Sequence, residues 1–137
     1  MKIVKRLNVP ASFFYSQVMK SVLFDIDDST GKQMKLNQLE NFEYVKEFVN
    51  KGHAKIMIEK VEENRFYRFK TSTTKNEFTS NYEIVPISDT ICEVRYSEEM
   101  VSHGWFQKAN DLALGTFLGY FKKRQLKVML EAIEALY

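Results

Sequence analysis

Residues that could bind a metal or act as a nucleophile are few in this sequence and widely spaced. His53 and His103 are the only histidines, and neither has a second histidine, a cysteine or a carboxylate at a spacing that metal sites use. We therefore expect no metal and no cofactor, and we interpret both histidines as surface or turn residues. Cys92 alternates with Val94 on an apolar strand face, which predicts a buried and unreactive thiol.

Two neighbouring carboxylates close a predicted strand shortly before the second histidine. Glu98 and Glu99 are the carboxylates nearest to His103 in sequence, and the two would form an acid/base pair at the strand end if their side chains met. Charged residues are ordinary at strand ends, however, so we expect no catalytic residue. A cyclase- or hydrolase-like enzyme that uses one of these three residues is the weaker alternative.

Three tyrosines are candidates of another kind. Tyr67, Tyr82 and Tyr96 fall on the apolar faces of predicted strands, and a buried phenol needs a hydrogen-bond partner. Such a hydroxyl either orients a ligand in an apolar pocket or reaches backbone or water inside a filled core. Both interpretations stay open.

Two glycines interrupt the predicted C-terminal helix. Gly115 and Gly119 each cost the helix about 1 kcal/mol relative to alanine, so a specific packing reason is expected for them. Their spacing places them on neighbouring turns of one side. Close packing of another backbone explains them, and so does space that is kept open for a ligand.

The N-terminal half supplies a strand and then a helix. Apolar side chains alternate in residues 2–9, which predicts a strand, and Pro10 suits the start of the helix that follows. Helical spacing of apolar residues then predicts about three turns over 13–24, ended by the turn-forming residues 25–31. Residues 32–41 are weakly patterned and are expected to form a short helix or a loop.

The middle of the chain predicts an antiparallel meander. Short polar turns near residues 50–52, 62–64, 74–76 and 86–89 separate runs in which apolar and polar residues alternate. One face of each run should be covered and the other wet. The residues expected on the covered face are Ala54, Ile56, Ile58, Tyr67, Phe69, Phe78, Ser80, Tyr82, Ile84, Cys92, Val94 and Tyr96.

One long helix is predicted from Trp105 to Tyr137, because this stretch lacks proline and is rich in Ala, Leu, Lys and Glu. At 1.5 Å per residue it would measure roughly 50 Å and cross the domain. Its apolar residues form two stripes rotated about the axis. A further side of this helix is also apolar and consists of Leu114, Phe117, Leu118 and Phe121. We expect another part of this chain, or a second copy in a homodimer, to pack against it.

Length and composition limit the class of protein. With 137 residues, 45% of them hydrophobic, the chain is expected to form a single domain over residues 1–137. A net charge of +2 with interleaved signs argues against nucleic acid as a partner. No stretch is long and apolar enough to span a membrane. A single cysteine and no signal peptide predict a cytoplasmic location.

The order of strand, helix, antiparallel meander and long C-terminal helix resembles the helix-grip superfamily. That superfamily includes START lipid-transfer domains, polyketide cyclases and birch-pollen-allergen-like proteins. The resemblance is carried by KIVKRLNVPASFFYSQV, YEIVPISDTICEVRYSEE and WFQKANDLALGTFLGYFKKR, and it covers nearly the whole chain. The chain looks most like a small uncharacterised bacterial group within it, although the glycine-rich loop of the plant allergens is missing.

The resemblance implies an α+β helix-grip fold in which a curved antiparallel sheet of about six strands wraps the long C-terminal helix. It also implies a small apolar or amphipathic ligand between sheet and helix, and this is the function we expect. The alternative is a non-enzymatic homodimeric interaction module with a filled core. The residues expected to contact a ligand are Tyr67, Phe69, Phe78, Tyr82, Ile84, Tyr96, Leu112, Gly115, Thr116, Gly119 and Tyr120.

Overall fold

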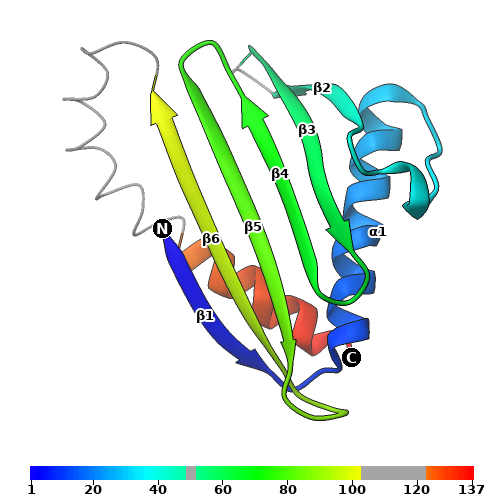
Figure 1. Cartoon of the computed structure of the whole chain (residues 1–137), viewed down its shortest axis with the longest axis vertical. Coiled ribbons are helices and arrows are strands. Elements are labelled where there is room, and N and C mark those ends of the chain that lie inside the picture. The colour runs from blue at the N-terminus through cyan, green and yellow to red at the C-terminus, as the bar shows by residue number, and fades with distance from the viewer. Residues whose placement is uncertain (49–51, 103–122) are drawn as a thin grey trace.

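The computed structural model describes residues 1–48, 52–102 and 123–137. Six antiparallel strands form one curved sheet in the order β1-β6-β5-β4-β3-β2 (Figure 1). Every hydrogen-bonded pair apart from β1 with β6 consists of strands consecutive in sequence, so the sheet is a meander, as predicted. The strands are β1 (Lys2–Leu7), β2 (Glu43–Phe48), β3 (Gly52–Glu62), β4 (Phe66–Ser72), β5 (Asn76–Pro86) and β6 (Cys92–Ser102).

Alternation along the strands determines which side chains are covered. Ala54, Ile56 and Ile58 of β3 are buried, whereas Lys55 between them is exposed. The register pairs Tyr67 with Tyr82 and Tyr82 with Tyr96, so these three tyrosines share one face across β4, β5 and β6. The predicted inward face of the sheet is confirmed by this register.

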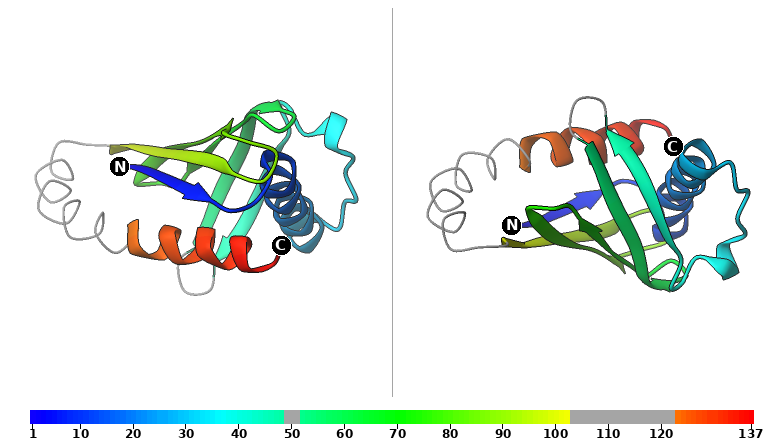
Figure 2. Two further views of the ribbon diagram at one scale, coloured as in Figure 1. Left: turned by 90° about the horizontal axis from the view of Figure 1, so that it is seen from below. Right: turned by 90° about the horizontal axis from the view of Figure 1, so that it is seen from above.

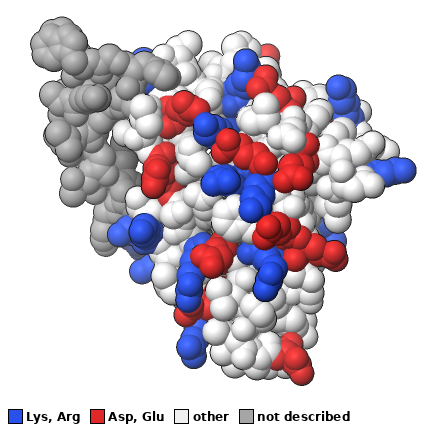
Figure 3. Space-filling model, in the orientation of Figure 1, with Lys and Arg blue, Asp and Glu red and all other residues white. Residues whose placement is uncertain are grey.

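The outer face of the sheet is covered by charges of both signs. Lysine, arginine, aspartate and glutamate side chains interleave over the strands (Figure 3). Nζ of Lys70, for example, lies 3.7 Å from Oε2 of Glu59 and 3.5 Å from Oε1 of Glu77, both on neighbouring strands. This face is wet, and no single sign of charge dominates it.

The first helix, α1 (Ala11–Thr30), is longer than the sequence predicted. Residues 25–30 were expected to end it, yet they continue the helix because Ile26 is fully buried and holds the last turns against the core. Gly31 ends the helix in the left-handed conformation, with φ 74°, and its amide donates to the carbonyl of Asp27. The residues that follow contain one short 3₁₀ turn, η1 (Leu36–Gln38). This agrees with the short helix or loop expected there.

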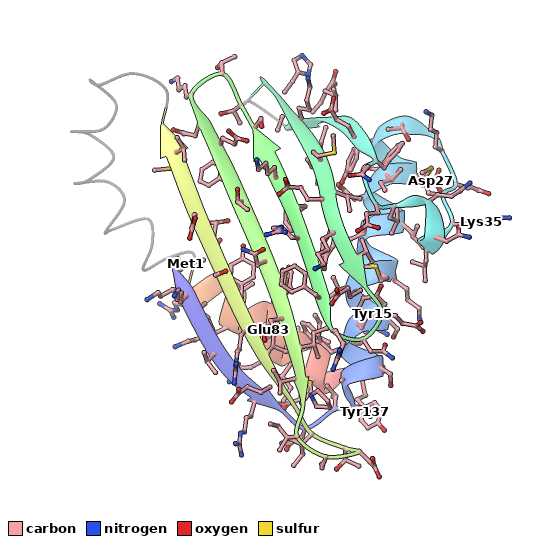
Figure 4. The ribbon with its side chains drawn as sticks, in the orientation of Figure 1. Met1, Tyr15, Asp27, Lys35, Glu83 and Tyr137 are labelled. Atoms are coloured by element: carbon pink, nitrogen blue, oxygen red, sulfur yellow. The ribbon has the colours of Figure 1, made fainter. Side chains whose placement is uncertain are left out.

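A C-terminal helix over residues 123–135 runs across the concave side of the sheet (Figure 2). Leu130 is fully buried, and Leu126 and Ile133 pack against the core. Tyr137 lies at the lower end of α1 (Figure 4), where its ring meets Phe13 edge-on with centroids 4.8 Å apart. The helix predicted from residue 105 is therefore seen from 123 onward, and its earlier part lies outside the described residues.

The buried core is continuous from the sheet to both helices. Phe14, Met19 and Ile26 of α1 join Leu7 of β1 and Leu130 of the C-terminal helix in one apolar cluster. Within residues 1–48, 52–102 and 123–137, no helix combines the length and apolar character needed to cross a bilayer.

Candidate ligand-binding cavity

A cavity of about 470 Å³ lies between α1, the concave face of the sheet and the C-terminal helix. Most of its wall is apolar or aromatic, and one end carries polar groups. The described residues that line it come from α1, from four neighbouring strands and from the C-terminal helix. They are Val18, Ser21, Val22, Asp25, Tyr44, Lys46, Ile56, Tyr67, Phe69, Thr71, Tyr82, Met129 and Ile133.

Aromatic rings cover the sheet side of the cavity. The rings of Tyr67 and Phe69 lie 5.1 Å apart at 24°, and those of Tyr67 and Tyr82 lie 6.2 Å apart at 14°. Period two places Tyr67 and Phe69 on one face of β4, and cross-strand pairing adds Tyr82 from β5. The three near-parallel rings form an aromatic wall on this side of the cavity.

Burial raises the pKa of two phenols in this wall. It is the largest cause that raises the pKa of Tyr67 above its ordinary value, and the charges of Tyr82 and Asp25 raise it further. Burial also raises the pKa of Tyr82 to about 12, with Glu98 as the second cause. Both hydroxyls therefore stay protonated at neutral pH and can donate hydrogen bonds.

The polar end of the cavity is built on Asp25, Tyr44 and Lys46. Asp25 follows Ser21 by one helical turn on α1, while Tyr44 and Lys46 point to one face of β2. The Tyr44 hydroxyl donates to Oδ2 of Asp25 at 2.5 Å, and Lys46 Nζ donates to Oδ1. Burial and then the bond to Asp25 raise the pKa of Tyr44. One carboxylate thus joins the helix to the sheet.

A smaller cavity of about 260 Å³ shares Met129 with the large one as a lining residue. Glu98 lines it and accepts hydrogen bonds from the hydroxyls of Tyr96, at 3.1 Å, and Ser80, at 3.4 Å. Glu99 is the next residue of β6 and is exposed, because successive side chains of a strand point to opposite faces. The acid/base pair of Glu98 and Glu99 considered from the sequence is therefore not formed.

The structure places the predicted ligand-contacting residues at different sites. Tyr67, Phe69 and Tyr82 line the large cavity. Ile84 and Tyr96 are not among the residues that line the large cavity; Ile84 is buried in the core, and Tyr96 lines the smaller cavity. Phe78 shares the inward face of β5 but is not part of the cavity wall. Leu112, Gly115, Thr116, Gly119 and Tyr120 lie outside the described residues.

The sequence prediction missed the contribution of α1 and β2 to the cavity. Asp25 was interpreted as a turn former, although it lies one turn after Ser21 and near Val18 and Val22 on the inner side of α1. Tyr44 and Lys46 carried a usable signal, since residues two apart on a strand share a face. The partner that turns Lys46 inward is not visible in the local pattern.

Among the described residues, the remaining chemical candidates do not come together in a site. Cys92 is fully buried, and burial, followed by the charge of Glu134, raises the pKa of its thiol to about 11. His53 is exposed beside Glu47, which agrees with a surface residue, and His103 lies outside the described residues. In the described part of the chain, no three His, Cys, Asp or Glu side chains gather as metal ligands would.

A comparison with protein-family models gives a match over most of the chain. The family model described as "Domain of unknown function (DUF3284)" matches residues 1–119. The chain belongs to this family. Among curated protein sequences, none matches the chain.

Solved structures similar to this DUF3284 member share its fold at low sequence identity. A START superfamily protein from Mycobacterium smegmatis superposes with a TM-score of 0.61 at 12% identity, covering 100% of this chain and 98% of that chain. A conserved protein from Geobacillus kaustophilus gives 0.60 at 15%, covering 96% and 93%. Norcoclaurine synthase from Thalictrum flavum, in complex with dopamine and hydroxybenzaldehyde, gives 0.60 at 13%, covering 99% and 84%. The fold is the helix-grip fold, as the resemblance implied.

Proposed function

We propose that this chain binds a small apolar or amphipathic molecule in the large cavity and performs no catalysis. The observation that carries the proposal is the cavity itself, whose volume of about 470 Å³ lies within the range of ligand pockets. Its wall combines aromatic and aliphatic side chains with a few polar groups at one end. Pockets that hold small molecules have this composition.

The alternatives receive less support. An interaction module with a filled core would not keep a cavity of this size, since protein interiors are close-packed. The apolar surface that motivated a homodimer lies outside the described residues. For an enzyme, Glu98 and Glu99 point to opposite faces, and both oxygens of Asp25 already accept hydrogen bonds. A small-molecule complex of the same fold, the norcoclaurine synthase structure, agrees with ligand binding.

Filling the cavity with a side chain tests the proposal. Val18 lines the cavity from α1, and Val18→Trp should place an indole ring where a ligand would lie. The matched control is Val45→Trp, because Val45 is exposed on β2 and does not line the cavity. The probe is N-phenyl-1-naphthylamine, a neutral dye that brightens in apolar sites.

The two variants should differ in dye binding. Wild type and Val45→Trp are expected to bind the dye saturably, whereas Val18→Trp should lose at least about tenfold in affinity, a difference of about 1.4 kcal/mol. Melting curves confirm that each variant is folded. Equal dye binding by both tryptophan variants, or a wild type that does not saturate, would reject the cavity as a binding site. Native mass spectrometry of protein from its own host then reports the natural ligand.

A further inference from the structure

The polar end of the cavity is electrically balanced. Asp25 and Lys46 are the charged residues among its described lining, and they form an ion pair with each other. Their side chains are 24% and 33% exposed, so the pair is largely removed from water. A ligand that enters the cavity therefore meets a paired carboxylate and a paired ammonium group.

An ionised ligand gains little from such an arrangement. A carboxylate head group would compete with Asp25 for Lys46, and an ammonium group would compete with Lys46 for Asp25. In either case one protein charge would lose its partner in a partly buried place, and that loss is costly. The carboxylate of Asp25 also holds the Tyr44 hydroxyl through its other oxygen, which fixes its orientation.

Neutral polar groups match the remaining lining. Ser21 of α1 and Thr71 of β4 line the cavity and carry hydroxyl groups, and the oxygen of Tyr44 keeps lone pairs after donating its proton to Asp25. Hydroxyl groups both donate and accept, so they pair with an alcohol, phenol, carbonyl or amide. The near-parallel rings of Tyr67 and Phe69, 5.1 Å apart, offer a flat surface to the rest of the molecule.

Building on the ligand binding proposed above, we propose that the ligand is an electrically neutral molecule with a flat aromatic body and a hydroxyl or carbonyl end. The aromatic body lies against Tyr67, Phe69 and Tyr82. The polar end lies toward Tyr44 and the ion pair of Asp25 and Lys46. Fatty acids and amines are excluded as the preferred class, because the charges that would neutralise them are already paired.

Three probes with one body and different head groups test the charge preference at pH 7. They are 2-naphthol, which is neutral, 2-naphthoate, which is an anion, and 2-naphthylmethylammonium, which is a cation. Calorimetric titration should give 2-naphthol the tightest binding by about tenfold. An ionised probe that binds as tightly or more tightly overturns this inference and leaves ligand binding standing. If no probe saturates, ligand binding and this inference both fail.

Substitutions of the ion pair should redirect the preference. Asp25→Asn removes the carboxylate that forms the ion pair with Lys46, so 2-naphthoate should become the best probe. Lys46→Met leaves Asp25 unpaired, so 2-naphthylmethylammonium should become the best probe. The double variant Asp25→Asn with Lys46→Met should again prefer 2-naphthol, which keeps the test valid if one single variant is unstable.

Matched controls make the same charge changes away from the cavity. Asp28→Asn alters an exposed residue of α1, and Lys55→Met alters an exposed residue of β3 that pairs with Glu43 on the outer face. Both controls should keep the order of the three probes found for wild type. If the controls shift the order as far as the cavity variants do, net charge of the protein is responsible and the inference is overturned.

Discussion

At the scale of single residues, burial of Tyr82 should make the stability of the fold fall as the pH becomes alkaline. Its pKa is raised from 10.0 in the unfolded chain to about 12 in the fold. Because the folded-state pKa is the higher one, the neutral phenol contributes its full stability below pH 10, and this contribution is lost as the pH rises to about 12. We predict that the free energy of unfolding, measured with urea, falls across this window.

The variant Tyr82→Phe has no proton to lose at this position. Its free energy of unfolding should decline less steeply than that of wild type over the same pH window. Near neutral pH, the free energy of unfolding of the two proteins should change with pH at the same rate. Identical slopes for the two proteins would contradict the assignment of the alkaline loss to Tyr82.

The thiol of Cys92 should be unreactive in the folded protein. It is fully buried, and its pKa is raised to about 11, so both access and thiolate formation are suppressed at neutral pH. We predict at least about a hundredfold slower labelling by iodoacetamide than in urea, as each unit of pKa shift removes about tenfold of the thiolate. A second thiol placed by Ser88→Cys in the exposed turn after β5 should label quickly, and fast labelling of Cys92 in wild type would refute the prediction.

The cavity could be predicted only in part from single residues. Tyr67, Phe69 and Tyr82 were found because alternation along a strand is a local property, and the register then brought them together. Asp25 was missed because its carboxylate meets Tyr44 and Lys46, which lie 19 and 21 residues later in the chain. A pairing of this kind depends on how α1 crosses β2, which no local period encodes.

At the scale of elements, the last turns of α1 depend on Ile26. This side chain is fully buried, and the carbonyl of Ile26 accepts a hydrogen bond from Thr30 Oγ1 at 2.7 Å. Ile26→Ala should destabilise the protein by about 2–5 kcal/mol, since it leaves a cavity at the helix end. Phe24→Ala is the control, because Phe24 is exposed and its loss should cost less than about 0.5 kcal/mol. Chemical denaturation measures both, and equal losses would contradict this role.

The same turns show why the end of α1 was placed too early from the sequence. Asp27, Asp28 and Ser29 have low helix propensity and are typical of turns. Burial of Ile26 outweighs this local preference, because a fully buried apolar side chain contributes more than the propensities of a few residues cost. Gly31 carried the correct signal for the end, since a left-handed residue after a helix is most often glycine.

At the scale of the whole molecule, the cavity exists because three elements meet without filling the space between them. The curved sheet supplies the aromatic wall, α1 supplies Val18 and Asp25, and the C-terminal helix lines another side with Met129 and Ile133. The C-terminal helix also forms an ion pair with β1, because Oε1 of Glu131 lies 3.2 Å from Nζ of Lys5. The proposed ligand binding and the stability of the fold should therefore both depend on the C-terminal segment.

Removing residues 123–137 should abolish cooperative folding. The deletion takes away Leu130, which is fully buried, and the partly buried Leu126 and Ile133 that pack beside it. It also removes Glu134, whose carboxylate accepts a hydrogen bond from the amide of Asn8 at 2.6 Å. The concave face of the sheet would then expose its apolar residues to water. This exposure costs about 25 cal/mol of stability for each Å² of apolar surface.

The control deletion removes only residues 136 and 137. Leu136 and Tyr137 are 69% and 64% exposed, so the main loss is the ring contact between Tyr137 and Phe13, worth about 0.5–1.5 kcal/mol. Calorimetry should show one sharp transition for this shorter deletion, at a slightly lower temperature, and no sharp transition for the longer one. A protein lacking residues 123–137 that still melts in a single sharp transition would contradict the role of the C-terminal helix as part of the core, and with it the closure of the cavity on that side.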